Sequence, residues 1–84
     1  MMVNIKNQAD LSIKIGSAKD LGLFIQQFRS SQKITQADIS GMANTGNRFI
    51  VELENGKETV QLKKVLDVLD TLGLEMIIQR KGGN

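Results

Sequence analysis

The sequence predicts a small, mainly α-helical domain in which four helices lie between two short β-strands. Apolar and polar residues alternate near both ends of the chain, which is typical of strands with one buried face. Between those segments the apolar residues recur with the 3.6-residue period of helices, and start and stop residues divide them into four. The chain has 84 residues, which is enough for one domain with a thin core.

The first two elements are a strand over residues 11–15 and a helix over residues 17–31. In the strand, LSIKI, the apolar side chains lie on one face, and Gly16 ends the run. Ser17 opens the helix as an N-cap, with an acid three residues later in SAKD, an arrangement that resembles a capping box. The apolar side of this helix consists of Leu21, Phe24, Ile25 and Phe28.

Two short helices follow, over residues 35–43 and 47–55. Thr35 and the acid three residues later in TQAD predict a capping box at the start of the first one. Its apolar side consists of Ile39, Met42 and Ala43. Residues 44–46, NTG, favour a turn because asparagine and glycine tolerate positive φ angles, and Gly56 ends the second helix. Two helices joined by a short turn with a glycine are the signature of a helix-turn-helix motif.

The last predicted elements are a helix over residues 59–72 and a strand over residues 74–80. Thr59 can cap the helix. Its apolar side consists of Leu62, Val65, Leu66, Leu69 and Leu72. The strand alternates in LEMIIQRK, and we expect residues 81–84 to form a loose tail. No linker composition divides the chain, so residues 1–84 are interpreted as a single domain.

Composition excludes several functional classes. The formal net charge is +2, from 11 basic and 9 acidic side chains, which by itself does not indicate nucleic-acid binding. The chain has no cysteine and no histidine, so thiolate chemistry, the commonest general base and the commonest metal ligand are missing. We therefore expect no catalytic residue, no metal site, no cofactor and no enzyme activity. No apolar run is long enough to span a membrane, and the first residues lack the order of a signal peptide, so we expect a cytoplasmic protein.

The segment ITQADISGMANTGNRFIVELENGK resembles the helix-turn-helix of the Cro/phage-repressor (XRE) family without a gap. The matching features are Thr35-Gln36 at the start of the second helix, Ile39 and Ile50 as apolar anchors, the turn at Asn44, and the closing Leu53-Glu54-Asn55-Gly56. The segment LKKVLDVLDTLGLEMII is similar to the C-terminal part of HipB-type antitoxins, in which a helix runs directly into a strand. The resemblance implies a lambda-repressor-like four-helix domain whose terminal strands form a dimer sheet.

The resemblance places the start of the third helix in the major groove of DNA. Asn47 there can bond an adenine edge, and Arg48 can bond a guanine edge or a phosphate. Gln36 matches a family position that grips the DNA backbone, and Asn55 and Lys57 match a loop that holds phosphate on the other flank. The alternative for Arg48 and Lys57 is an ordinary solvated charge, and for Asn55 a simple helix end.

Two acids of the third helix need separate interpretations. In the resembling repressors, the acid at the position of Glu54 pairs with an arginine near the end of the first helix, where Arg29 stands here. The resemblance therefore implies a structural ion pair between Arg29 and Glu54. Glu52 lies on the other side of Leu53, where it can accept from a cytosine amino group or repel wrong sequences. Phe49, bulkier than the residue usual at its position, either packs or touches a thymine methyl.

Two apolar strands at opposite ends of the chain predict a homodimer. Pairing the strands and duplicating the pair across a two-fold axis would bury their apolar faces and remove an exposed edge. A dimer also supplies two recognition helices for a palindromic operator in double-stranded DNA, with half-sites ~34 Å apart or a multiple of that distance. The leading hypothesis is therefore a sequence-specific transcriptional repressor.

The resemblance to HipB-type antitoxins implies a second partner, a HipA-like kinase toxin, with joint repression of the operon that encodes both. Two alternatives stay open. One is a protein-interaction module that neutralises a toxin without DNA contact, and the other is a stand-alone phage-type repressor. No membrane partner is expected. A gel shift on promoter DNA at two salt concentrations separates DNA binding from the interaction module.

Overall fold

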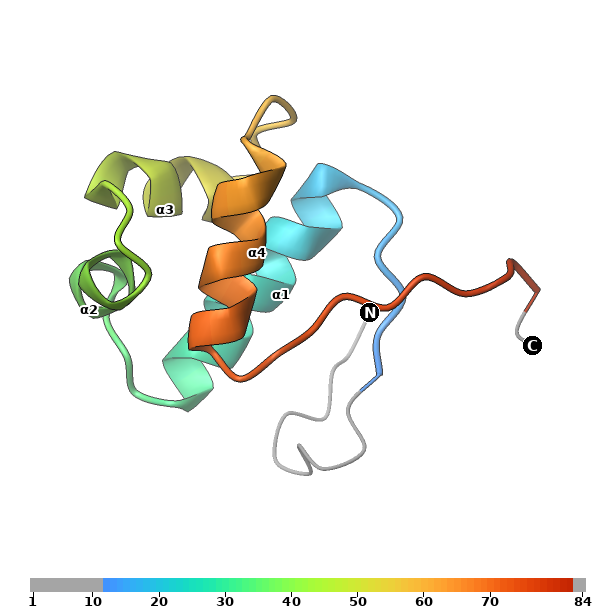
Figure 1. Cartoon of the computed structure of the whole chain (residues 1–84), viewed down its shortest axis with the longest axis horizontal. Coiled ribbons are helices and arrows are strands. Elements are labelled where there is room, and N and C mark those ends of the chain that lie inside the picture. Colours follow the sequence, from blue (N-terminus) through green and yellow to red (C-terminus); the bar gives the residue numbers. More distant parts are fainter. Residues whose placement is uncertain (1–11, 83–84) are drawn as a thin grey trace.

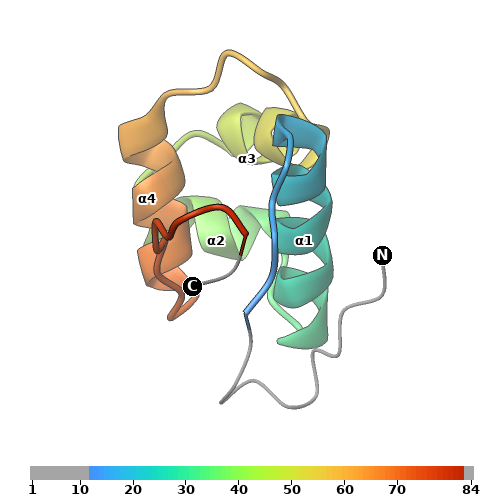
Figure 2. The same ribbon diagram turned by 90° about the vertical axis from the view of Figure 1, so that its right-hand side faces the viewer.

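The computed structural model describes residues 12–82, which form a four-helix domain (Figure 1). The helices are α1 (Ala18–Ser31), α2 (Gln36–Met42), α3 (Asn47–Glu54) and α4 (Leu62–Thr71). α3 packs against both α1 and α2, and α4 packs against α2. In the second view α1 and α4 stand on opposite sides of α2 (Figure 2). Within this part of the chain no helix combines the length and the apolarity that a membrane crossing requires.

Side chains with oxygen acceptors begin the first two helices. The Ser17 hydroxyl accepts from the Asp20 backbone N–H at 3.0 Å, and the Asp20 carboxylate accepts from the Gly16 N–H at 3.0 Å. At α2 the exchange is reciprocal: the Thr35 hydroxyl accepts from the Asp38 N–H, and the Asp38 carboxylate accepts from the Thr35 N–H. The capping box predicted for α2 is therefore confirmed. At α1 the acid reaches one residue further back than a capping box requires.

Two residues with positive φ angles set the direction of α3. Asn44, with φ of 56°, lies in the turn that joins α2 to α3. Gly56, with φ of 84°, follows the C-terminal end of α3. A Cβ atom at Gly56 would lie 2.9 Å from the Cα atom of Lys19, so the turn also depends on the missing side chain. These turns set the direction in which the chain enters α3 and leaves it.

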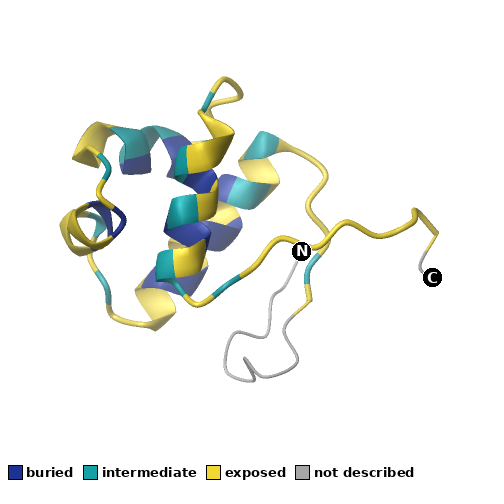
Figure 3. Cartoon of the chain, viewed as in Figure 1, coloured by how far each residue is buried: buried dark blue, intermediate teal, exposed yellow. Residues whose placement is uncertain are grey.

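The core lies between the inward faces of all four helices (Figure 3). Phe24 and Phe28 of α1 pack with their ring centroids 5.7 Å apart. The buried apolar residues are Phe24, Ile25, Phe28, Ile39, Ala43, Ile50, Leu53, Val65, Val68 and Leu69. Each helix therefore contributes to one continuous core, and α3 contributes two fully buried apolar side chains to it.

Three side chains that were predicted on the apolar faces of helices are exposed. Met42 is 60% exposed, because Ile39 and Ala43, four residues apart, form the buried line of α2. Leu62 and Leu66 of α4 are 61% and 42% exposed. They lie off the buried line of α4, which consists of Val65, Val68 and Leu69. The core assignments of Met42, Leu62 and Leu66 were therefore wrong.

α4 begins later than the predicted residue 59. Its N-cap is Gln61, which has an extended backbone and makes no side-chain cap bond. Thr59 lies in the preceding loop. A threonine is a common start signal for a helix, but here the buried apolar line of the helix begins only at Val65. The packed part of the helix therefore determines where it starts.

No strand forms within residues 12–82 of the single chain. Residues 12–15 and 74–80 lie outside the helices, and the second segment runs away from the helical body in Figure 1. Leu11, which begins the first predicted strand, and residues 83–84 of the predicted tail lie outside the described residues. Isoleucines of both segments are exposed, by 39%, 73% and 94% for Ile15, Ile77 and Ile78. The terminal strands and the dimer sheet stay predictions.

Candidate nucleic-acid interface

α3 is anchored by its apolar side and presents a polar side to solvent. Ile50 is 0% exposed and Leu53 is 1% exposed, so these two side chains fix the helix on the core. Asn47 and Arg48, in its first turn, are exposed, and the side chain of Arg48 is 90% exposed. The N-cap, Gly46, has no side chain that could cover this turn. The first turn of α3 is therefore open to a large partner.

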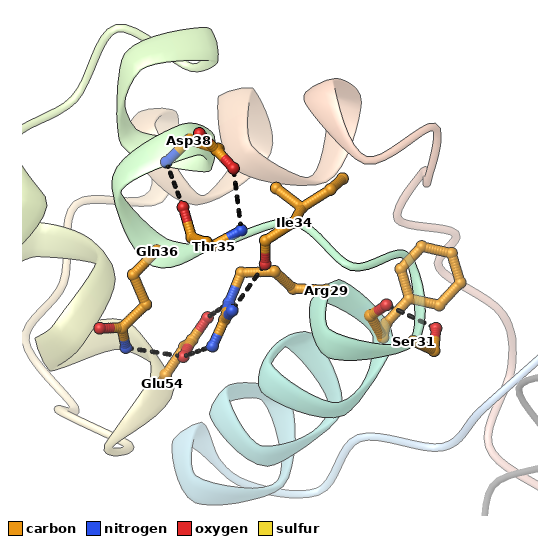
Figure 4. A network of polar contacts seen from close by, with 8 residues as sticks. Arg29, Ser31, Ile34, Thr35, Gln36, Asp38 and Glu54 are labelled. Atoms are coloured by element: carbon orange, nitrogen blue, oxygen red, sulfur yellow. Dashed lines mark hydrogen bonds and ion pairs between the residues drawn. The ribbon is translucent and has the colours of Figure 1, made fainter.

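A buried polar cluster centred on Glu54 lies behind this surface (Figure 4). Arg29 of α1 donates from Nε to Glu54 Oε2 at 2.6 Å and from Nη2 to Oε1 at 3.0 Å. The Nη1 atom of Arg29 donates to the backbone carbonyl of Ile34 at 2.7 Å. The Glu54 side chain is only 2% exposed, and the hydrogen bond to this carboxylate raises the pKa of Arg29. The pair is bidentate, so two charge-assisted hydrogen bonds fix its geometry.

Gln36, at the first helical position of α2, belongs to the same cluster. Its Nε2 atom donates to Glu54 Oε1 at 3.0 Å, and the residue is half-buried. One carboxylate therefore joins α1, α2 and α3. The bond fixes the direction of the Gln36 side chain, while the carboxamide keeps a second N–H and the oxygen for other partners.

A second carboxylate, that of Glu52, lies on the solvent side of α3 between two basic side chains. Its Oε2 accepts from Arg48 Nε at 3.2 Å, and its Oε1 accepts from Lys57 Nζ at 3.2 Å. The hydrogen bond from Lys57, and after it that from Arg48, lowers the pKa of Glu52. The structure thus brings together three of the side chains that the sequence proposes for DNA contact, with opposite charges facing one another.

The loop after α3 offers fewer donors than the resemblance implies. The backbone N–H of Asn55 donates to the Val51 carbonyl at 3.0 Å, that of Gly56 to Leu53 at 3.1 Å, and that of Lys57 to Glu52 at 3.0 Å. These bonds complete the last turn of the helix. The side chains of Asn55 and Lys57 are exposed, so they can reach a phosphate from this loop.

Phe49 packs on the core and does not stand free toward solvent. The residue is partly buried against the core cluster. The Nζ atom of Lys64, on α4, lies 5.6 Å from the centroid of its ring. A cation at this distance from an aromatic face is attracted to it. Of the two interpretations of Phe49, the structure supports packing.

Comparison with known proteins assigns the chain to a family. No protein-family model matches it. An uncharacterised HTH-type transcriptional regulator, y4mF of Sinorhizobium fredii, is 42% identical over 69 residues, which cover 82% of this chain and 91% of the relative. The chain belongs to the HTH-type transcriptional regulators.

Two solved structures have the same fold as this regulator. One is the HipB-O4 20mer complex and the other is the HipA-HipB-O2-O3 complex. Each matches with a TM-score of 0.78 and 21% identity over 83% of this chain and 99% of the solved chain. At this identity the likeness establishes the fold alone, a four-helix helix-turn-helix domain. Together with the relative, it confirms the XRE-type resemblance.

Some features of the regulator's site were not foreseen from its sequence. The bridging position of Glu52 is one, although the four-residue spacing from Arg48 is a signal for such a pair on a helix. The bond from Gln36 to Glu54 and the position of Lys64 over a ring are others, and they depend on how helices distant in sequence pack. Within residues 12–82, no group of His, Cys, Asp and Glu side chains is assembled as a metal site would require.

Proposed function

We propose that the regulator is a sequence-specific DNA-binding repressor whose α3 enters the major groove. The observation that carries the proposal is Arg48, 90% exposed in the first turn of a helix whose other side is fixed by the buried Ile50 and Leu53. A helix anchored in this way can present bidentate groups to base edges. The solved complex of HipB with a 20mer supports the proposal, because its protein has the same fold.

The contacts divide into those that read bases and those that hold the backbone. Asn47 contacts an adenine edge, and Arg48 a guanine edge or a phosphate. Gln36, Asn55 and Lys57 hold phosphates on the two flanks of α3 and fix its register. The half-buried position of Gln36 is compatible with this assignment, since its bond to Glu54 holds the carboxamide in one orientation.

The repressor acts as a homodimer in this proposal. Two chains pair through residues 11–15 and 74–80, and the sheet covers two of the isoleucines that are exposed in the single chain, Ile15 and Ile78. The two-fold axis of such a dimer presents two copies of α3 to a palindromic operator. Without the partner, these side chains would stay in water.

The second proposed partner is a HipA-like kinase toxin, which makes the regulator the antitoxin that represses their common operon. The fold shared with the HipA-HipB-O2-O3 complex supports this assignment. Leu62 and Leu66, 61% and 42% exposed on the outer side of α4, favour a protein partner on that face. The same observation favours the second candidate function, an interaction module that neutralises a toxin without DNA contact.

Binding to a duplex from the regulator's own promoter tests the proposal. Affinity is measured by gel shift at two salt concentrations, with a scrambled duplex of equal composition alongside. Arg48→Ala should weaken promoter binding by ~1–3 kcal/mol. Lys57→Ala should weaken binding to both duplexes and lower the salt slope by about one unit.

Lys63→Ala is the matched control, because Lys63 pairs with Asp67 of α4 and not with a residue of α3. It removes the same charge and should leave promoter binding unchanged. If Arg48→Ala and Lys57→Ala bind like the wild type, the groove assignment is wrong. If the wild type does not prefer its promoter over the scrambled duplex, the interaction module replaces the repressor as the better proposal.

A further inference from the structure

The carboxylate of Glu52 binds two of the basic side chains that the proposed function places in contact with DNA. Arg48 Nε and Lys57 Nζ each lie 3.2 Å from one of its oxygens. No other ion pair within residues 12–82 involves Arg48 or Lys57. The three side chains therefore form a surface cluster, the Glu52 triad, which carries one net positive charge.

The Glu52 triad is open to solvent and contributes little to folding. The side chain of Arg48 is 90% exposed, that of Lys57 45% and that of Glu52 28%. Exposed ion pairs are weak and are screened by salt, so their partners exchange readily. A DNA phosphate is an anion that can replace the carboxylate at either base. A phosphate that takes the donors now bound to Glu52 displaces the carboxylate, while the other N–H groups of Arg48 and Lys57 stay available to it.

We propose that Glu52 determines specificity by competing with DNA phosphates for Arg48 and Lys57. The inference rests on the proposed function, because it assumes that α3 faces DNA. On a wrong sequence, Arg48 and Lys57 move from Glu52 to phosphates. The carboxylate of Glu52 then faces the DNA polyanion without a partner. On the right sequence, a cytosine amino group in the major groove donates to the released carboxylate. Glu52 thus weakens binding to every sequence, and weakens it least on the operator.

The test compares the wild type with Glu52→Gln, which keeps the shape of the side chain and removes its charge. Asp67→Asn is the matched control. Asp67 accepts from Lys63 at 2.9 Å in a pair of the same four-residue spacing on α4. Both variants raise the net charge of the protein by one unit, but only Glu52→Gln releases Arg48 and Lys57 from their ion pairs. Fluorescence anisotropy measures binding to the promoter duplex and to the scrambled duplex over a salt series.

Glu52→Gln should bind the scrambled duplex roughly three- to tenfold more tightly, as expected from the loss of two weak ion pairs. Its salt slope on that duplex should steepen by about one to two units, because each released basic side chain can neutralise a phosphate. The gain on the promoter duplex should be smaller, so the ratio of the two affinities falls. Asp67→Asn should change each affinity by less than about twofold.

Several results would overturn the inference. If Glu52→Gln gains no affinity for the scrambled duplex, or if Asp67→Asn gains as much, Glu52 does not compete with phosphates for Arg48 and Lys57. An equal gain on both duplexes would remove its role in specificity. In each of these cases the preference of the wild type for its promoter leaves the proposed function intact. A wild type without that preference overturns the inference and the proposed function together.

Discussion

Glu54 carries a negative charge into the interior of a small domain. Its side chain is 2% exposed, and it accepts from two nitrogens of Arg29 and from Gln36. A buried pair of this kind contributes little net stability, because the cost of removing both charges from water offsets their attraction. Removing one partner is different, since the other charge is then left buried without compensation. The sensitive residue of α3 is therefore the acid that faces away from solvent.

Glu54→Ala should lower the free energy of unfolding by ~3–5 kcal/mol, because it leaves the Arg29 guanidinium without its partner. The measurement is urea unfolding at matched protein concentration, since the stability of a dimer depends on concentration. Glu52→Ala, a substitution of the same kind on the solvent side, is the control and should leave the unfolding free energy nearly unchanged. Replacing Arg29 by Met and Glu54 by Leu together should recover much of the loss. Equal losses for the two single variants would mean that α3 is turned the other way.

The pKa of Glu52 gives a prediction with a defined pH window. Donation from Lys57 and Arg48 places this pKa below its ordinary value. A depressed pKa in the folded state contributes stability that is fully present above the pKa of the unfolded state, and is lost as the pH falls through the folded value. The small advantage of the wild type over Glu52→Gln should therefore be fully present at about pH 6 and reduced at about pH 3.

Urea unfolding of both proteins at the two pH values measures this difference. The other carboxylates are common to both proteins, so their titration cancels in the comparison. About 1 M salt should reduce the advantage at the higher pH, because it screens exposed pairs. An advantage that does not change with pH would show that the ionised carboxylate of Glu52 has no favourable contact in the folded protein.

At the residue scale, a contact could be predicted only where the sequence pattern matches a contact known in the resembling family. The resemblance implied a pair between Arg29 and Glu54, and the structure contains it. The bond from Gln36 to Glu54 could not be derived, because it depends on the rotamers of two helices that meet in space. The DNA contacts of Asn47 and Asn55 stay predictions, since no property of a single chain tests them.

Helices α1 and α3 approach each other closely at Gly22. A Cβ atom there would meet the backbone carbonyl oxygens of Leu53 and Glu54, the second at 2.8 Å. These are backbone atoms, so they cannot move aside as a flexible side chain would. Gly22→Ala should therefore separate the helices and cost at least ~1–3 kcal/mol of stability.

Gly41 is the matched control, a helical glycine of α2 with no atom within 4 Å of its missing Cβ position. Gly41→Ala should stabilise the domain by about 0.5–1 kcal/mol, because alanine loses less backbone freedom in a helix. Thermal melts followed by circular dichroism compare the two variants. A Gly22→Ala protein as stable as the Gly41→Ala protein would contradict the close approach.

At the element scale, the start of α2 was predictable and the start of α4 was not. The capping box of Thr35 and Asp38 is local chemistry that a sequence displays directly. The start of α4 at Leu62 depends on where its buried line begins, as does the exposure of Leu66. Apolar residues of a short helix fit more than one line, and packing against the other helices selects among them.

An exposed apolar surface lies on the segment after α4. Ile78 is 94% exposed, and Leu74, at the start of the same segment, packs against the core. If this segment is a strand of the proposed dimer sheet, Ile78→Asp places a charge where the apolar face should be buried. The variant should dimerise about tenfold or more weakly, from the loss of ~1.5–3 kcal/mol of apolar burial.

Gln79→Asp introduces the same charge at the next residue, on the other face of such a strand, and is the control. Sedimentation at a series of concentrations measures both dissociation constants, and neither change touches Leu74. Ile78→Asp should be monomeric where Gln79→Asp and the wild type are dimers. A dimer of undiminished strength in Ile78→Asp would place the interface on another surface.

Glu54 belongs to α3 and accepts from side chains of α1 and α2, so one carboxylate links three helices. If α1 or α3 opened alone, a charge would be left unpaired in the interior, and if α2 opened alone, Glu54 would lose the hydrogen bond from Gln36. Partial opening is therefore costly. We expect their most protected amides to exchange with deuterium in a single shared event. α2 and α3 would then meet a binding partner as one preassembled piece, with little ordering entropy left to lose on contact.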